Sequence, residues 1–161
     1  MDNLIYTTLK EYRFPDQLSK LIVAQAKHES ANYTSKVFKE NNNLFGYKFV
    51  GQSLASKGTK APANEGDYYA KYKSVKDSVL ELIKWIQRRQ KENKFPADLS
   101  TITTPGQYAQ LLKQSGYYGD KVTTYTNALT KWLKTVSVTA AGASAGLIIG
   151  IVSFFLLKKI L

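Results

Sequence analysis

The feature that most constrains this chain is a long run without charge near its C-terminus. Residues 136–157 read VSVTAAGASAGLIIGIVSFFLL, and lysines stand on both sides of them. A helix of that length spans about 33 Å, close to the thickness of the hydrocarbon core of a bilayer. We therefore expect one transmembrane helix here, with the flanking lysines reaching the two interfaces. A buried core helix fits the length and the lack of charge less well.

Three glycines recur at every fourth position of this run, namely Gly142, Gly146 and Gly150. That spacing places them on one face of a helix, where the backbone of a second helix can approach closely. The face predicts self-association, although small residues are also common in spanning helices that do not pair.

The uncharged run divides the chain into a domain of residues 1–135 and a membrane segment with a short basic tail, residues 136–161. The N-terminus, MDNLIYTTLKEY, carries an early acid, no basic region and no long apolar run, so it does not resemble a secretory signal. Lysines at both ends of the run leave its orientation open. We expect a single-pass membrane protein with a C-terminal anchor, in a virion membrane or a bacterial envelope.

Basic residues outnumber acidic ones by 23 to 12, a formal net charge of +11, and only Lys158 and Lys159 follow the uncharged run. The excess therefore belongs to the domain and indicates an anionic partner. The absence of cysteine excludes disulfides and thiolate metal sites, and a single histidine, His28, argues against histidine metal sites and histidine-activated nucleophiles. No basic helix, zinc pattern or stacking motif favours nucleic acid. We expect no nucleic-acid partner, no metal and no cofactor.

Apolar residues of the domain recur mainly at helical spacing. The expected helices are residues 3–12, 16–30, 75–94, 105–115 and a last one from 123 or 124, which can continue into the membrane segment. Residues 44–50 and 68–72 are expected as two short strands separated by a polar loop, residues 51–66. The pattern predicts a mainly α domain with a small β-hairpin.

Glu29 stands out because it lies at the expected end of the helix over residues 16–30. A carboxyl group at the end of a packed helix, facing a cleft, is partly desolvated, and this keeps it protonated near neutral pH. Such a group can donate its proton to a glycosidic oxygen. Most single glutamates are solvated surface residues, so position alone does not assign this chemistry.

Four motifs follow one another along the domain. They are AQAKHES at residues 24–30, NNLFGYK at residues 42–48, YAKYKSVKDS at residues 69–78, and residues 108–125 with GYYGD at their centre. In this order, over residues 15–134, they resemble the glucosaminidase domains of glycoside hydrolase family 73. The resemblance implies a lysozyme-like helical fold and an endo-β-N-acetylglucosaminidase that cleaves the glycan strands of peptidoglycan, its expected partner.

The same resemblance assigns site residues position by position. Glu29 matches the catalytic acid and Tyr117 the tyrosine near the cleavage point. The residues expected to contact substrate or to form the cleft floor are Asn43, Phe45, Gly46, Tyr72 and Tyr118. Phe45 can equally well support the fold, and Tyr72 can belong to the core or to the cleft.

The second carboxylate of the family is less clear in this sequence. Glu65 and Asp67 are the only acids between Glu40 and Asp77, and we favour Glu65 as the further catalytic residue. If neither reaches the cleft, the acetamido group of the substrate can act as the nucleophile. Two other functions stay open: a lytic transglycosylase with the same substrate, and an inactive wall-binding membrane protein. The compact chain and its lone anchor favour a phage virion or lysis enzyme.

Overall fold

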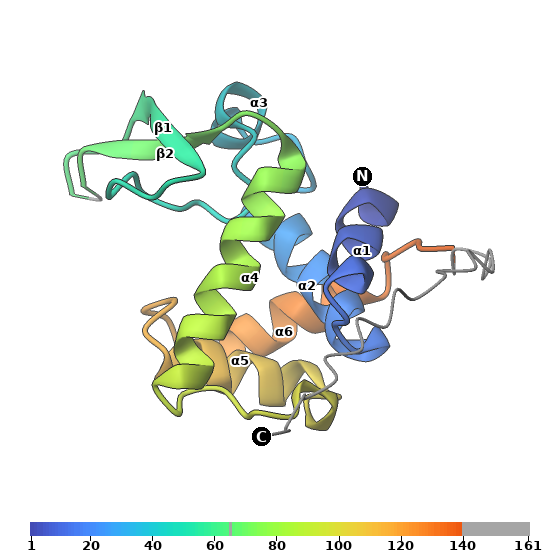
Figure 1. Ribbon diagram of the computed structural model, residues 1–161. Coiled ribbons are helices and arrows are strands. Elements are labelled where there is room, and N and C mark those ends of the chain that lie inside the picture. Colours follow the sequence, from blue (N-terminus) through green and yellow to red (C-terminus); the bar gives the residue numbers. More distant parts are fainter. Residues whose placement is uncertain (65, 140–161) are drawn as a thin grey trace, which may run out of the picture.

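The computed structural model describes residues 1–64 and 66–139, and Figure 1 shows their arrangement. In chain order its elements are α1 (Asp2–Glu11), α2 (Asp16–Glu29), α3 (Lys36–Asn41), β1 (Ala55–Lys60), β2 (Tyr68–Tyr72), α4 (Val75–Lys91), the 3₁₀ turn η1 (Leu99–Thr101), α5 (Pro105–Gln114) and α6 (Val122–Leu133). The long helix α4 links the hairpin and α3 at one end to α5 and α6 at the other, with α1 and α2 beside it (Figure 1).

Two helices begin with the capping signals that the sequence predicts. The Ser74 hydroxyl accepts the backbone N–H of Asp77, whose carboxylate accepts the N–H of Ser74, and α4 starts directly after Ser74. Thr104 and Gln107 form the same reciprocal pair at the start of α5, with a proline at its first position. Each pair satisfies backbone donors that a helix start otherwise leaves unbonded. These expectations are confirmed.

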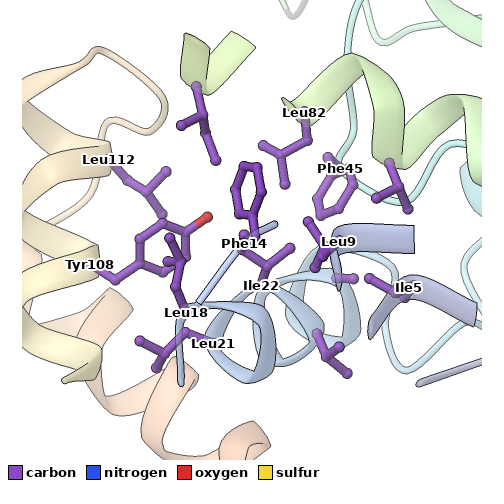
Figure 2. Packing of buried hydrophobic residues seen from close by; sticks show 14 of the residues in the cluster. Ile5, Leu9, Phe14, Leu18, Leu21, Ile22, Phe45, Leu82, Tyr108 and Leu112 are labelled. Carbon is purple, nitrogen blue, oxygen red and sulfur yellow. The ribbon is translucent and has the colours of Figure 1, made fainter. Parts of the chain in front are cut away.

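The core surrounds α2, whose predicted stripe of Leu18, Leu21, Ile22 and Ala26 is completely buried. Figure 2 shows these leucines and Ile22 among side chains from α1, α4 and α5. Burying each of these side chains contributes about 2 kcal/mol of hydrophobic free energy. The core thus fixes α2, and with it the position of the helix end at Glu29.

The hairpin differs from its prediction. Strand β1 lies inside the segment expected to be a loop, and it pairs antiparallel with β2, with Ala55 opposite Tyr72. Residues 44–50 form only an isolated bridge, between Lys48 and Tyr69, so the strand expected there is wrong. The Asn43 side chain explains this: it accepts the N–H of Tyr47 and donates to the carbonyls of Tyr47 and Ala70, which satisfies the loop without a ladder. Helix α3 was not predicted.

The last helix ends at Leu133, so it does not continue directly into the segment after it, which the sequence had left open. The following backbone is held by residues near the N-terminus: Lys27 donates to the carbonyl of Thr135 at 2.6 Å, and Asp2 accepts the N–H of Ser137 at 2.9 Å. Residues 136–139 are not helical. The rest of the predicted membrane segment, including Gly142, Gly146 and Gly150, lies outside the described residues. Within residues 1–64 and 66–139, no helix combines the length and the apolar character that crossing a membrane requires.

Candidate active site

Glu29 is the last residue of α2, and an unusual turn ends the helix there. Ala31, Asn32 and Tyr33 all have positive φ, at 49°, 53° and 66°. A left-handed conformation costs about 1–2 kcal/mol for a residue with a Cβ, so the surrounding structure must hold this turn. The buried Ser30 hydroxyl does so by accepting the N–H of Tyr33 and donating to the carbonyl of Ala26. The turn takes the chain away and leaves Glu29 at the edge of a cleft.

The Glu29 carboxylate has one direct side-chain partner among the described residues. Tyr125, on α6, donates its hydroxyl to Oε1 at 2.5 Å. Burial raises the pKa of Glu29, and this hydrogen bond opposes the rise. The Tyr125 ring is fixed on two sides: Tyr118 stacks on it at 4.1 Å between centroids, and His28 meets it edge-on at 5.3 Å. Glu29 is therefore a desolvated carboxyl group held by a rigid phenol.

The cleft beside Glu29 has a volume of about 840 Å³ and is formed by four parts of the chain. The loop after α3 and strand β2 line one part of it, and one face of α4 lines another. The loop between α5 and α6 lines a third part, and Glu29 lies at the end of α2. The residues that matter for the chemistry are Glu29, Phe45, Gly46, Tyr47, Lys48, Glu81, Trp85, Arg88, Tyr117 and Tyr118. Its volume lies within the usual range of ligand-binding clefts in proteins.

Tyr117 reaches the cleft as predicted. Its hydroxyl donates to the carbonyl of Phe45 at 3.1 Å, and its ring meets Tyr47 and Trp85 edge-on, at 6.2 and 5.5 Å. Burial raises the pKa of Tyr117, and the nearby charge of Glu29 raises it further. The phenol therefore stays neutral, and its oxygen remains able to accept a hydrogen bond from a sugar or a water.

The structure separates the other predicted residues into two groups. Phe45, Gly46 and Tyr118 line the cleft with Glu29 and Tyr117. Asn43 and Tyr72 do not line it, since each is 1% exposed. The Asn43 amide donates instead to the backbone carbonyls of Tyr47 and Ala70. Gly46 has φ of 67°, a conformation that favours glycine and lets the chain turn beside the cleft. Glu65 lies outside the described residues.

Sequence reasoning missed three cleft residues on α4 and one residue on α6. Glu81, Trp85 and Arg88 are spaced i, i+4 and i+7, so they share one face of α4, and all three line the cleft. Tyr125 is the residue on α6, and its bond to Glu29 was not foreseen. A polar stripe beside the apolar stripe of residues 75–94 was the available signal for the first group. Nothing in the sequence pairs Tyr125 with Glu29.

This arrangement defines a class of protein. The cleft contains a desolvated carboxyl group with a raised pKa, and neutral phenols stand beside it, which is suited to acid-assisted cleavage of a glycosidic bond. The fold agrees with this, because the chain is similar to the crystal structure of a peptidoglycan hydrolase from Sphingomonas sp. A1, with a TM-score of 0.59 and 19% sequence identity. The similarity covers 88% of this chain and 96% of the other chain. The protein therefore shares the fold of that enzyme, which is mainly helical in this chain and includes a small two-stranded sheet.

The family follows from the sequence match. Residues 6–137 match the model of the Glucosaminidase family, described as mannosyl-glycoprotein endo-beta-N-acetylglucosaminidase, so the chain belongs to this family and is a glycoside hydrolase. A search of curated protein sequences returns no significant match. The expected glucosaminidase resemblance is confirmed.

Proposed function

We propose that the protein is an endo-β-N-acetylglucosaminidase that hydrolyses the β-1,4 bond of peptidoglycan glycan strands, with Glu29 as the general acid. The observation that carries the proposal is the Glu29 carboxyl group at the cleft edge, desolvated and held by Tyr125. The family membership and the similar fold of a peptidoglycan hydrolase support the substrate. The excess of basic residues suits an anionic wall polymer.

In the proposed reaction, protonated Glu29 donates its proton to the glycosidic oxygen as the bond from C1 to that oxygen breaks. Burial raises the pKa of the carboxyl group and so favours its protonated form, and the Tyr125 hydroxyl stabilises the carboxylate that forms. Tyr117 stands close by as a neutral phenol and can orient the acetamido group or the attacking water. These roles belong to the described residues of the cleft.

The group that assists C1 on the other face of the sugar is a separate proposal. We keep Glu65 as the first choice, Asp67 as the second, and the acetamido group of the substrate as the third. Glu65→Gln and Asp67→Asn, each assayed alone, distinguish them: a loss of about 10²-fold or more identifies the carboxylate, and full activity in both variants favours substrate assistance.

The test is a digest of purified peptidoglycan by the full chain in detergent, compared with Glu29→Gln, with products identified by mass spectrometry. We expect N-acetylglucosamine at the new reducing ends from the parent and a loss of about 10²–10⁴-fold in the variant. Glu40→Gln, the same change at an exposed carboxylate on α3, serves as the control and should keep full activity.

The products also decide between the alternatives. 1,6-Anhydro ends would show a lytic transglycosylase that uses the same glutamate on the same substrate. Binding to the wall without any cleavage, by folded parent protein, would leave a wall-binding module and remove the enzymatic proposal.

Membrane anchoring through residues 136–157 is a further part of the proposal, and it rests on the uncharged sequence alone. Anchoring would place the cleft near a membrane, in a phage virion or in the bacterial envelope, where local opening of the wall is useful. Pairing of helices through Gly142, Gly146 and Gly150 belongs to the same proposal. Flotation of the full chain with lipid vesicles tests the anchor, and failure to float would remove it.

A further inference from the structure

We propose that Arg88, held in place by Glu81, is the subsite that binds a carboxylate substituent of the glycan strand. This inference rests on the proposed function, because it names the part of the peptidoglycan substrate that the site recognises. On alternate sugars, wall strands carry carboxylates on the peptide stem, or on the lactyl group where no stem is attached. The two residues belong to the same cleft as Glu29 but lie on α4, away from the motifs that carry the family resemblance.

The buried partner of this pair is Glu81, which is 4% exposed. The nearest guanidinium nitrogen of Arg88 stands 3.7 Å from Oε1, beyond a good hydrogen bond, and no hydrogen bond from another described residue reaches this carboxylate. A buried charge needs a partner of opposite sign, so Glu81 holds the guanidinium close to the cleft floor. The desolvation of such a pair can exceed its Coulombic gain, so its contribution to folding stability does not by itself explain it.

The exposed partner is Arg88, whose side chain remains 55% accessible. A guanidinium has five N–H donors in a planar fork, and among the described residues the one ion pair of Arg88 is with Glu81. The remaining donors face solvent in the cleft and match the two oxygens of a carboxylate. Lys48, the other cation of the cleft among the described residues, lies over the Tyr69 ring at 3.5 Å.

The neighbours of Arg88 make the position selective rather than generally basic. Trp85 forms the wall one turn earlier on α4 and is 7% exposed. Arg89, the next residue, is bound to Glu92 and lies against the Trp85 ring, so it is turned away from this role. Arg88 therefore provides a partly exposed cation, paired with Glu81, in the cleft that Glu29 also lines.

The test uses the full chain in detergent and two forms of the same teichoic-acid-free sacculi. One form is native, and in the other the carboxylates are coupled to ethanolamine as neutral amides. Initial rates of reducing-end release at low substrate concentration report kcat/KM. We expect Arg88→Gln to lose about tenfold on native sacculi and nothing on the neutral form, with Arg88→Lys between it and the parent. Lys84→Gln, an equal charge change at an exposed site on α4, should behave as the parent.

Three results would overturn the inference. Arg88→Gln could keep the parent's preference for native sacculi, it could lose activity equally on both forms, or Lys84→Gln could show the same loss. If the parent cleaves neither form, the proposed function fails, and co-sedimentation then decides the subsite. In that case Glu29→Gln should bind native sacculi about tenfold more tightly than neutral ones, and Glu29→Gln combined with Arg88→Gln should not. Equal binding of both forms by Glu29→Gln would reject the subsite.

Discussion

At the scale of single residues, the chemistry of the site depends on how Glu29 keeps a proton. The titratable side chains around it are Tyr125 from α6, Tyr108 from α5, Tyr117 from the following loop, and His28 with Asp120 nearby. Burial raises the pKa of each of these tyrosines and lowers that of His28, whose pKa Asp120 raises in part. The phenols around Glu29 are therefore neutral at neutral pH, and desolvation is the largest cause of the raised pKa of Glu29.

Replacing Tyr125 by phenylalanine tests this balance. A general acid works while protonated, so activity falls as the pH rises through the pKa of Glu29. The Tyr125 hydroxyl stabilises the carboxylate and lowers that pKa, so Tyr125→Phe should move the alkaline limb of the pH–rate profile to higher pH. The rate at the optimum should fall about fivefold because a positioning bond is lost. A lower rate with an unmoved limb would mean that Tyr125 only supports the fold.

The sequence was informative for residues that belong to a contiguous motif and silent for those that meet only in space. Glu29 and Tyr117 were placed in the cleft from short motifs, whereas Asn43, from the same motif as Phe45, turned out to be buried under the loop. Tyr125 is 96 positions from Glu29, and its periodicity showed only that it faces inward. Local patterns report which side of an element is buried, not which atom a side chain will meet.

At the scale of elements, the sequence predicted the longer helices and strand β2, but it did not predict α3 or strand β1. Capping boxes and apolar stripes in the sequence indicate where α4 and α5 begin. Strand β1, with the sequence ASKGTK, has no alternation of apolar residues because no side of it faces the core. It is held instead by Asn41, at the end of α3, which bonds to the Thr59 hydroxyl and N–H. Such side-chain support leaves no periodic signal.

Gly58 shows how tightly α3 and the hairpin fit. A Cβ at this position would lie 2.3 Å from Oδ1 of Asn41 and 2.9 Å from the backbone oxygen of Tyr69. Because Asn41 is buried and Tyr69 contributes backbone, Gly58→Ala should lower the free energy of unfolding by about 1–3 kcal/mol, measured by urea unfolding. Gly119→Ala is the matched control, since its Cβ would meet nothing within 4 Å. Equal stability of Gly58→Ala and the parent would show that α3 and the hairpin shift freely.

At the scale of the whole molecule, the two ends of the described chain close on each other. The Asp2 carboxylate accepts the Tyr33 hydroxyl at 2.7 Å and the Ser137 N–H at 2.9 Å, and it pairs with Lys27 at 3.0 Å. We call this group of contacts around Asp2 the clasp. Because Lys27 lies on α2, two residues before Glu29, the clasp joins the segment after α6 to the helix that carries the candidate acid. Its partners are up to 135 positions apart, and the fold class alone could not predict it.

The clasp predicts an acid-sensitive stability. Burial alone would raise the pKa of Asp2, but the bonds from Ser137 and Tyr33 and the Lys27 ammonium lower it overall. A lowered folded-state pKa stabilises the fold above about pH 4, and this contribution disappears as the pH falls through the folded-state value. Asp2→Asn leaves the buried Lys27 unpaired and should cost about 3 kcal/mol at pH 7 in urea unfolding. The difference from the parent should shrink as the pH falls through the folded-state pKa of Asp2, because below that pKa the parent's Asp2 is also neutral. A difference that stays constant with pH would assign the loss to packing, and Glu40→Gln, at an exposed carboxylate, should change stability little throughout.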